Sequence, residues 1–448
     1  MQTPSVVRED LDASNRLAFA MAAEGRWEEA EEILVRIIGR NKKYLRVNKK
    51  DDSNLSLSVQ FPDASQVHVS WLSYRIGHSL FHSRQPLAAR EYFRRAMDLS
   101  ERSRSRDAMW ATCANFLLLC NFEVTTADCL AENDALLDAW QEQFGAQCWH
   151  LLGRSAQAFL ARRHKEAVDL IDQARHVEAD NPFEIPTLQK SMHCVLPWEE
   201  MRWEALTTTA APAPAWELDL RHEVARGSVV HLCAADAGYF AKFGEAFVRS
   251  ALKAGFSDLI HLHVVNPDAR SRELVNLIHG LPGIKVNFSF SEYRDQPHTK
   301  AYYATARFIF ASRVMDLYGC DLLISDIDVA LQQDAKDFAL QFAGADVGVR
   351  VRPVKNYFPW KTVIVNLVYL RNCEASRNAL SYVGKYFWLI VGDKSRSEIW
   401  GVDQSAFFFA VTLQPDATPI LDMNKLSDRY VSFAGNDKIA WASRILSN

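Results

Sequence analysis

The chain has 448 residues, and its 51 lysines and arginines against 55 aspartates and glutamates give a net charge of −4. This near-neutral balance does not favour nucleic acid as a partner, and the length predicts two or three domains, each with its own core. There is no apolar run long enough for a membrane-spanning helix. The eight cysteines show no zinc-like spacing and the opening MQTPSVVREDLDASN does not resemble a signal peptide, so we expect a cytoplasmic protein with reduced thiols.

The first part of the chain has the pattern of amphipathic helices. Apolar residues recur at i, i+4 spacing, as at Leu17 and Met21, and glycine and proline are sparse. The pattern continues to about residue 205. It predicts an all-α domain over residues 1–206.

Three segments of this helical domain share small and large residues at corresponding positions. They are residues 25–37, 76–96 and 158–174, and the pattern is similar to the tetratricopeptide repeat (TPR). Such repeats stack into solenoids that bind peptides or partner proteins, so the resemblance implies a protein acceptor or partner bound here. A generic helical bundle is the alternative. Four aromatic residues are candidate anchors for a partner or members of the core: Trp71, Tyr74, Trp110 and Trp149.

A linker and an α/β domain follow. The Ala/Pro/Thr-rich stretch TTTAAPAPAW predicts a linker, which we place at residues 207–220. Short β-rich runs then alternate with helical patterns, at residues 229–233, 260–265, 284–288, 321–324 and 347–351. Strands separated by helices predict a mixed, mostly parallel sheet over residues 221–448.

Two carboxylates follow the fourth of these runs. Asp326 and Asp328 are spaced i, i+2, so both can project to the same side of an extended backbone. Neighbouring carboxylates in a buried place repel each other unless a cation neutralises them, and oxygen ligands suit Mn²⁺ or Mg²⁺, which can bind a diphosphate. A solvated pair of acids without a metal is the alternative interpretation.

The surroundings of this pair resemble a known family. Residues 302–331 are similar to the donor-site core of GT-A fold glycosyltransferases, most closely to family 8, which includes glycogenin and bacterial lipooligosaccharide galactosyltransferases. In that group a Tyr-Ala-Arg helix precedes a strand that ends in Asp-x-Asp, much as Arg307 precedes Asp326-Ile327-Asp328 here. The resemblance implies that these four residues bind the nucleotide-sugar donor.

The start of the α/β domain also resembles this family. Residues 229–239 look like its first strand and nucleotide loop, so the resemblance implies that Ala234, Ala235 and Asp236 contact the base and that Tyr239 stacks on it. Without the family, Asp236 would be interpreted as a helix N-cap, because a helical pattern follows it immediately.

Two later segments complete the resemblance, which covers residues 229–441. Asp403 and Gln404 are similar to the Asp-Gln element beside the sugar and the acceptor. Residues 432–441 are close to the closing His-Phe-x-Gly-x-x-Lys-Pro-Trp motif, which implies that Gly435 and Lys438 lie at the diphosphate. As single elements, such segments are more simply explained as helix caps and loops.

The chain also departs from the family pattern. Ser432 stands where the family has a histidine that is the third metal ligand, and Asn366 represents an Asn-x-Gly-Val segment without its glycine. A hydroxyl is a poor substitute for imidazole. The resemblance therefore implies a metal held by Asp326, Asp328 and Ser432, and it leaves the donor sugar open.

Together these patterns predict a metal-dependent glycosyltransferase that uses a UDP-sugar with retention of configuration. The expected cofactor is Mn²⁺ or Mg²⁺, and the expected catalytic residues are Asp403, Gln404 and Lys438. Two alternatives stay open. One is a non-catalytic scaffold with a degenerate sugar-nucleotide fold, and the other is a metal-dependent hydrolase or nucleotidyltransferase.

Overall fold

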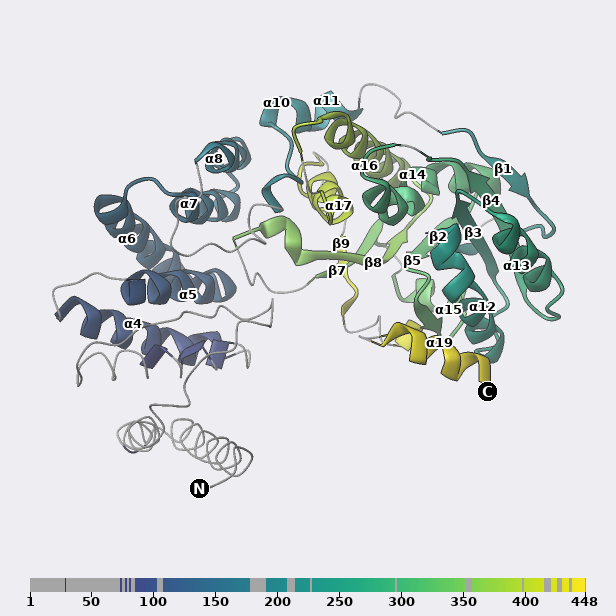
Figure 1. Ribbon diagram of the computed structural model, residues 1–448, viewed down its shortest axis with the longest axis horizontal. Helices are drawn as coiled ribbons and strands as arrows, with labels where there is room; N and C mark the ends of the chain where they lie inside the picture. Colours follow the sequence, from purple (N-terminus) through teal and green to yellow (C-terminus); the bar gives the residue numbers. More distant parts are fainter. Residues whose placement is uncertain are drawn as a thin grey trace, which may run out of the picture. The chain divides into compact units, whose positions relative to one another are not determined.

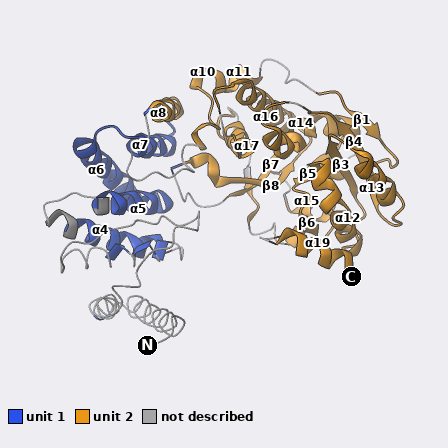
Figure 2. Cartoon of the chain, viewed as in Figure 1, with its two compact units in different colours: residues 1–163, 177–185, 354–357 blue, residues 164–176, 186–353, 358–448 orange. Residues whose placement is uncertain are grey.

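The computed structural model divides the chain into two compact units (Figure 2). Unit 1 contains residues 1–163, 177–185 and 354–357, and unit 2 contains residues 164–176, 186–353 and 358–448. The structure describes residues 29, 73–74, 77–78, 80–81, 85–102, 108–177, 191–207, 214–225, 228–294, 296–342, 344–351, 357–396, 399–414, 420–424, 429–434 and 437–447. Within these ranges we find no helix with the length and apolar character of a membrane span.

Unit 1 is helical, as predicted for the N-terminal region. Its described helices pack in succession and are α4 (Pro86–Arg102), α5 (Ala108–Val124), α6 (Ala127–Phe144) and α7 (Cys148–Leu160) (Figure 1). Ala89, Phe93 and Ala96 are fully buried. A Cβ atom on Gly77 would lie only 2.9 Å from the Phe93 ring, so a small residue is required there. The first predicted repeat, apart from Glu29, lies outside the described residues.

The aromatic residues of unit 1 belong to its core. Tyr74, Trp110 and Trp149 are at most 6% exposed, so of the two interpretations these three are members of the core, and Trp71 lies outside the described residues. Trp149 packs edge-on against Tyr357, with ring centroids 5.3 Å apart. Large apolar side chains at helical spacing bury themselves because that removes the most apolar surface from water.

Unit 2 contains an eight-stranded mixed sheet with the order β1-β4-β3-β2-β5-β8-β7-β9. Its strands are β1 (Glu217–Asp219), β2 (Val229–Asp236), β3 (Leu259–Val265), β4 (Lys285–Ser291), β5 (Asp321–Ser325), β7 (Val347–Val351), β8 (Val363–Leu370) and β9 (Ile420–Asp422). Strands β2 to β5 are mutually parallel, and β8 pairs antiparallel with both β5 and β7. The predicted mixed, mostly parallel sheet is confirmed, and so are the five predicted strands.

Helices join the strands and cover the sheet (Figure 1). The helices of this unit are α8 (His164–His176), α10 (Trp198–Met201), α11 (Trp203–Thr207), α12 (Ala237–Lys253), α13 (Ala269–His279), α14 (Thr299–Tyr318), α15 (Ala335–Ala339), α16 (Glu374–Gly392), α17 (Val402–Thr412) and α19 (Lys438–Ser447). Helix α14 packs on β2, β3 and β5 and contacts α16 and α17, whereas α12 contacts α13 and α19. A small second sheet pairs β6 (Val329–Leu331) with β10 (Val431–Phe433).

The order of the strands places a crevice beside β2. The chain moves from β2 to β3 and β4 on one side, and β5 then pairs with the other side of β2, so the direction of the winding reverses between β2 and β5. Cys233 pairs with Ser325, so the carboxyl ends of the two strands lie side by side. Open α/β sheets bind their ligands at such a switch point. The site residues that follow these strands are therefore expected to meet there.

Residues 191–206, which precede the expected linker, pack within unit 2. The Tyr382 hydroxyl of α16 donates a hydrogen bond to the Met201 carbonyl at 2.6 Å, and the Tyr386 hydroxyl donates one to the Cys194 carbonyl at 2.7 Å. Both tyrosine side chains are fully buried. All eight cysteines of the chain are free thiols, as predicted, and six of them are buried.

Candidate functional site

A cavity of about 450 Å³ lies at the switch point between β2 and β5. It is lined by Ala234, Ala235, Asp236, Tyr239, Lys300, Tyr303, Ala304, Arg307, Asp326, Ile327, Asp328, Val365, Asn366, Trp400, Gly401, Asp403, Gln404 and Lys438. The predicted site residues therefore meet in one cavity, with two exceptions. Ser432 does not line it, and Gly435 lies outside the described residues.

Local structure explains how the acidic residues reach this cavity. Asp236 is the last residue of β2 and caps α12, where its carboxylate accepts hydrogen bonds from the backbone N–H groups of Gly238 and Tyr239. Asp326 and Asp328 occupy the connection between β5 and β6. Because parallel strands end at the same edge of the sheet, both connections open into the crevice.

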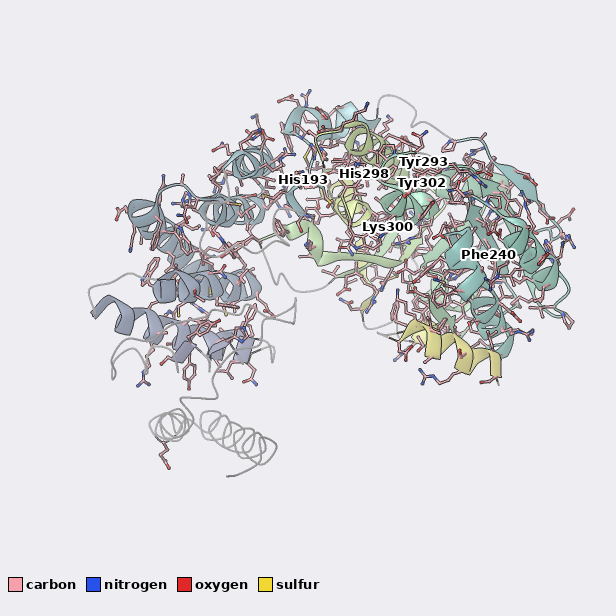
Figure 3. All side chains as sticks on the ribbon, in the orientation of Figure 1. His193, Phe240, Tyr293, His298, Lys300 and Tyr302 are labelled. Carbon is pink, nitrogen blue, oxygen red and sulfur yellow. The ribbon has the colours of Figure 1, made fainter. Side chains whose placement is uncertain are left out.

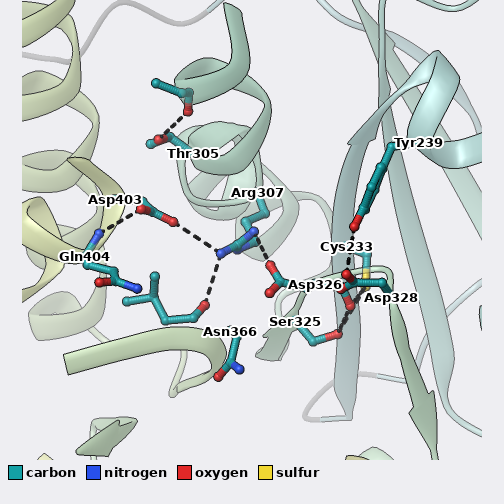
Figure 4. A network of polar contacts seen from close by, with 12 residues as sticks. Cys233, Tyr239, Thr305, Arg307, Ser325, Asp326, Asp328, Asn366, Asp403 and Gln404 are labelled. Carbon is teal, nitrogen blue, oxygen red and sulfur yellow. Dashed lines mark hydrogen bonds and ion pairs between the residues drawn. The ribbon is translucent and has the colours of Figure 1, made fainter. Parts of the chain in front are cut away.

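Arg307 of α14 joins two of the predicted acidic residues (Figure 4). Its Nη1 atom lies 2.7 Å from Oδ1 of Asp326, and its Nη2 atom lies 3.4 Å from Oδ2 of Asp403. The same Nη2 donates a hydrogen bond to the Val365 carbonyl at 3.1 Å. The Arg307 side chain is only 6% exposed. Because its guanidinium has several acceptors, it is a buried charge of the kind that proteins tolerate.

Lys438, Tyr239 and Asp328 form a second charged group at the cavity. The Tyr239 hydroxyl donates to Oδ2 of Asp328 at 2.7 Å, and the Lys438 ammonium donates to the Tyr239 oxygen at 2.9 Å and pairs with Asp328. Burial raises the pKa of Tyr239 to about 12, so its hydroxyl keeps the proton that it donates. Burial alone would lower the pKa of Lys438, but its hydrogen bonds to Asp328 and Tyr239 raise it.

The cavity carries an excess of negative charge. Four lining carboxylates, of Asp236, Asp326, Asp328 and Asp403, stand against the three cations Lys300, Arg307 and Lys438. Burial raises the pKa of Asp326 to about 6; Arg307 opposes this shift, and the carboxylates of Asp328 and Asp403 add to it. The arrangement therefore favours the binding of a further cation beside these carboxylates.

Sequence reasoning missed several lining residues that a helical pattern could have found. Lys300, Tyr303, Ala304 and Arg307 stand at i, i+3, i+4 and i+7 of α14, which places them on one face of the helix. Once Arg307 had been chosen, this spacing could have identified the other three. Trp400 directly precedes the Asp403 segment and gave no separate signal.

A second cavity adjoins the first. It has a volume of about 510 Å³ and is lined by His298, Thr299, Lys300, Ala301, Ile399 and Trp400. Lys300 and Trp400 line both cavities, and Figure 3 labels His298 and Lys300 at the start of α14. Trp400 is 69% exposed, so its indole ring lies at the surface beside both cavities.

The predicted third metal ligand is not at the cavity. Ser432 lies in β10, where it pairs with Ala330 of β6. Among the residues that the structure describes, no group of three or more histidine, cysteine, aspartate or glutamate side chains is arranged to hold a metal ion.

No protein-family model and no curated protein matches the chain. Among solved structures, the bifunctional glycosyltransferase WbbM is 13% identical over 50% of this chain and 46% of its own, with a TM-score of 0.32. Mouse xyloside xylosyltransferase 1 is 15% identical over 44% of this chain and 86% of its own, with a TM-score of 0.29. The galactosyltransferase LgtC, in complex with donor and acceptor sugar analogs, is 14% identical over 49% of this chain and 94% of its own, with a TM-score of 0.32. This chain thus spans less than half of WbbM, and the structures it is similar to are glycosyltransferases.

Proposed function

We propose that the protein is a GT-A glycosyltransferase related to family 8, and that the cavity at the switch point binds a nucleotide-diphosphate sugar. The observation that carries this proposal is the meeting of four sequence segments in one cavity. Residues from β2, α14, the β5–β6 connection and the start of α17 line it together with Lys438.

The cations of the cavity suit a reaction that releases a diphosphate. The bond between the anomeric carbon of the sugar and the diphosphate oxygen breaks, and the oxygen keeps the electron pair. The oxygen of an acceptor hydroxyl forms the new bond to the carbon, and its proton passes to the leaving diphosphate. Negative charge therefore grows on the leaving diphosphate, and preformed positive charge stabilises it. Lys438 is 47% exposed and can exchange Asp328 for the diphosphate, whereas Arg307 is buried and keeps Asp326 and Asp403 in place.

The roles of the other lining residues depend on which of their polar groups already have hydrogen-bond partners. Tyr239 and Asp236 lie at the end of β2, where the base is expected to bind. Both carboxylate oxygens of Asp403 have partners, Arg307 and the backbone N–H of Gln404. The Gln404 side chain is therefore the group of this segment that can contact the donor sugar. From the resemblance to family 8, we expect transfer with retention of configuration.

The acidic pair fits a divalent cation through its charge. The lining residues carry one net negative charge, and a nucleotide diphosphate adds more. Mn²⁺ or Mg²⁺ held by Asp326 and Asp328 would offset much of this charge and would stabilise the leaving diphosphate as a Lewis acid. Ser432 does not line the cavity, so we propose Asp326 and Asp328 as the protein ligands.

For the acceptor, we propose a protein that the TPR-like helices of unit 1 bind. The second cavity, which shares Lys300 and Trp400 with the first, is the place where the acceptor group would enter. A separate helical unit is more than a small sugar acceptor requires, and helical repeats commonly hold extended peptides.

Titration of the full chain with UDP in the presence of Mn²⁺ tests the donor proposal. We expect binding, and we expect release of UDP when the matching UDP-sugar and acceptor are supplied. Absence of binding by UDP and by other nucleoside diphosphates would favour the scaffold alternative. Release of a monophosphate or pyrophosphate would favour a hydrolase or nucleotidyltransferase.

A truncated chain tests the role of the helical unit. The cut must leave residues 191–206 in place because Met201 and Cys194 accept buried hydrogen bonds from α16, so we would remove residues 1–163. Tyr357 packs in unit 1 and would be changed to serine in the same variant. We expect slow hydrolysis of the donor and loss of transfer to the protein acceptor. Full transfer would show that unit 1 is not the recognition device.

A further inference from the structure

The pairing of β7 with β8 is interrupted beside the cavity. Val349 pairs with Val368, but the next residue, Arg350, pairs with Ile364. Residues 365–367 of β8 therefore have no partner in β7. Such a bulge changes the direction in which nearby side chains point, and bulges are frequent next to binding sites.

The bulged segment is held by the candidate site. The Val365 carbonyl accepts a hydrogen bond from Arg307 at 3.1 Å, and the Asn366 carbonyl accepts one from the Asp326 backbone N–H at 3.3 Å. Both carbonyls are thus bound to residues that line the cavity, and Asn366 lines it as well. The position of the Asn366 side chain is therefore tied to the acidic pair.

Arg350 determines which way the Asn366 carboxamide faces. Nη1 of Arg350 donates a hydrogen bond to Oδ1 of Asn366 at 3.1 Å, and the guanidinium lies 4.5 Å from the centre of the Phe433 ring. A guanidinium has only donors, so it can bind the oxygen of a carboxamide but not its amino group. The Nδ2 amino group of Asn366 must then point away from Arg350, and it has no hydrogen-bond partner among the described residues.

The position of Asn366 indicates which part of a donor would meet this amino group. In Figure 4, Asn366 lies on the same side of Asp326 as Gln404 and away from Tyr239. If the base binds at Tyr239, the sugar lies toward Gln404 and Asn366. This step rests on the proposed function.

We propose that Arg350 is a positioning residue, and that it orients Asn366 so that the amino group donates a hydrogen bond to an oxygen of the donor sugar. The sugar therefore presents a hydrogen-bond acceptor, a hydroxyl or carbonyl oxygen, at this point. Arg350 itself does not line the cavity and acts through Asn366.

The test compares the affinity of UDP with that of UDP-glucose and UDP-galactose, because only the sugar would meet Asn366. The measured quantity is the ratio of UDP-sugar affinity to UDP affinity, by titration calorimetry with Mn²⁺. In Arg350→Met we expect this ratio to fall by about two- to tenfold, the value of one hydrogen bond. Asn366→Ala should lower it equally, and the double variant should lower it no further, because both changes remove the same contact.

Two further variants distinguish an effect on the orientation of Asn366 from an effect on folding. Asn366→Asp keeps the pair with Arg350 and the thermal stability, but it has no amino group, so the ratio should still fall. Arg350→Lys, whose ammonium can also donate to Oδ1, should restore part of the ratio. The matched control is Arg377→Met, since Arg377 pairs with Asp316 outside the cavity and its loss should leave the ratio unchanged.

The outcomes distinguish this inference from the proposed function. If the unaltered chain binds neither UDP, the UDP-sugars nor any other nucleoside diphosphate, the proposed function is wrong and the role of Arg350 is lost with it. If UDP-sugars bind and the ratio is the same in Arg350→Met and Asn366→Asp as in the unaltered chain, only the inference is overturned. Should Arg350→Met not fold, Asn366→Asp and Arg350→Lys decide the question.

Discussion

Two clusters of polar side chains in unit 2 differ in whether their hydrogen-bonding capacity is used up. The histidine–serine cluster consists of His261, His263, Ser289 and Ser291 on β3 and β4. His263 contacts Ser289 at 2.8 Å through Nδ1 and Ser291 at 2.9 Å through Nε2, and His261 contacts Ser289 at 2.8 Å. All four side chains are at most 4% exposed. Both nitrogens of each imidazole ring have partners, because Nδ1 of His261 contacts the Tyr318 hydroxyl at 2.8 Å.

The charged cluster at the cavity consists of Arg307, Asp326, Asp328, Asp403 and Lys438. Its groups also pair, but Asp326 and Lys438 are 36% and 47% exposed and face an open volume. Neutral groups that saturate one another stabilise a core, whereas charged groups with spare capacity beside a cavity can bind a ligand. We therefore expect the first cluster to be structural, and the second is the one that we propose to be functional.

The largest effect is expected when a carboxylate is removed from the charged cluster. In Asp326→Ala and in Asp328→Ala we expect transfer to fall at least ~10³-fold, because the leaving diphosphate would lose the cation that we propose these residues hold. The fold should be retained, since Asp403 and Val365 still bind Arg307. The rate of UDP release measures transfer, and thermal unfolding of each variant checks that the fold is retained.

The matched control comes from the histidine–serine cluster. Ser289→Ala removes a buried hydroxyl between His261 and His263, so it should lower the thermal stability and leave transfer per folded molecule unchanged. Near-normal turnover in both aspartate variants with Mn²⁺ present would mean that the acidic pair is not part of the site.

The sequence predicted five of the described strands of unit 2, β2, β3, β4, β5 and β7, because their apolar runs are continuous and lie between helical patterns. It also selected Asp326, Asp328, Arg307 and Asp403, which the structure brings to one cavity. It could not predict that Arg307 binds both Asp326 and Asp403, because that depends on how α14 lies on the sheet. Contacts between residues about 100 positions apart carry no local signal.

The property that distinguishes the two clusters, whether their hydrogen-bonding capacity is used up, could not be predicted from the sequence either. His261 and His263 have the i, i+2 spacing of potential metal ligands, and only the pairing of β3 with β4 shows that serines bind both rings. Ser432 was predicted from a motif position, and the pairing of β10 with β6 places it outside the cavity lining. In both cases strand register, which depends on long-range packing, decides the role.

A slightly smaller effect on transfer is expected from replacing Lys438, the more exposed of the two basic residues in the charged cluster. Lys438→Ala should lower the rate constant of transfer by about 10²–10³, the effect of losing one group that stabilises developing negative charge. Lys438→Arg should recover part of the rate because the charge is kept. Steady-state kinetics with saturating acceptor measure the change. An unchanged rate in Lys438→Ala would remove this lysine from the site.

The histidine–serine cluster should instead respond in stability. His263→Leu fills a similar volume but leaves the Ser291 hydroxyl without its ring partner. We expect the free energy of unfolding to fall by about 2–4 kcal/mol, from the lost hydrogen bonds and the unsatisfied serine. Denaturant titration measures it. Equal stability in His263→Leu and the unaltered chain would show that the cluster contributes nothing to the core.

The same histidines should make the fold sensitive to acid. Burial lowers the pKa of His261 to about 3, and it lowers that of His263 well below the usual 6.5. The unfolded chain binds protons below about pH 6.5 and the folded chain does not, so stability is lost as the pH falls from 6.5 toward 3. Each histidine contributes up to about 1.4 kcal/mol per pH unit. The midpoint of unfolding of His263→Leu should therefore decline less steeply with acid than that of the unaltered chain, and parallel slopes would contradict this.

The smallest expected effect concerns Asp236, which caps α12 and also lines the cavity. Asp236→Ala should cost about 1 kcal/mol of stability through the lost cap. Asp236→Ser keeps an N-cap oxygen but not the carboxylate, so it should retain the stability while UDP binds more weakly. Asp268 is the matched control because it caps α13 by accepting from the Ser271 backbone N–H at 2.7 Å, and it does not line the cavity. Asp268→Ala should lower the stability without changing UDP affinity. If Asp236→Ser binds UDP as tightly as the unaltered chain, Asp236 is a helix cap alone and belongs with the structural cluster.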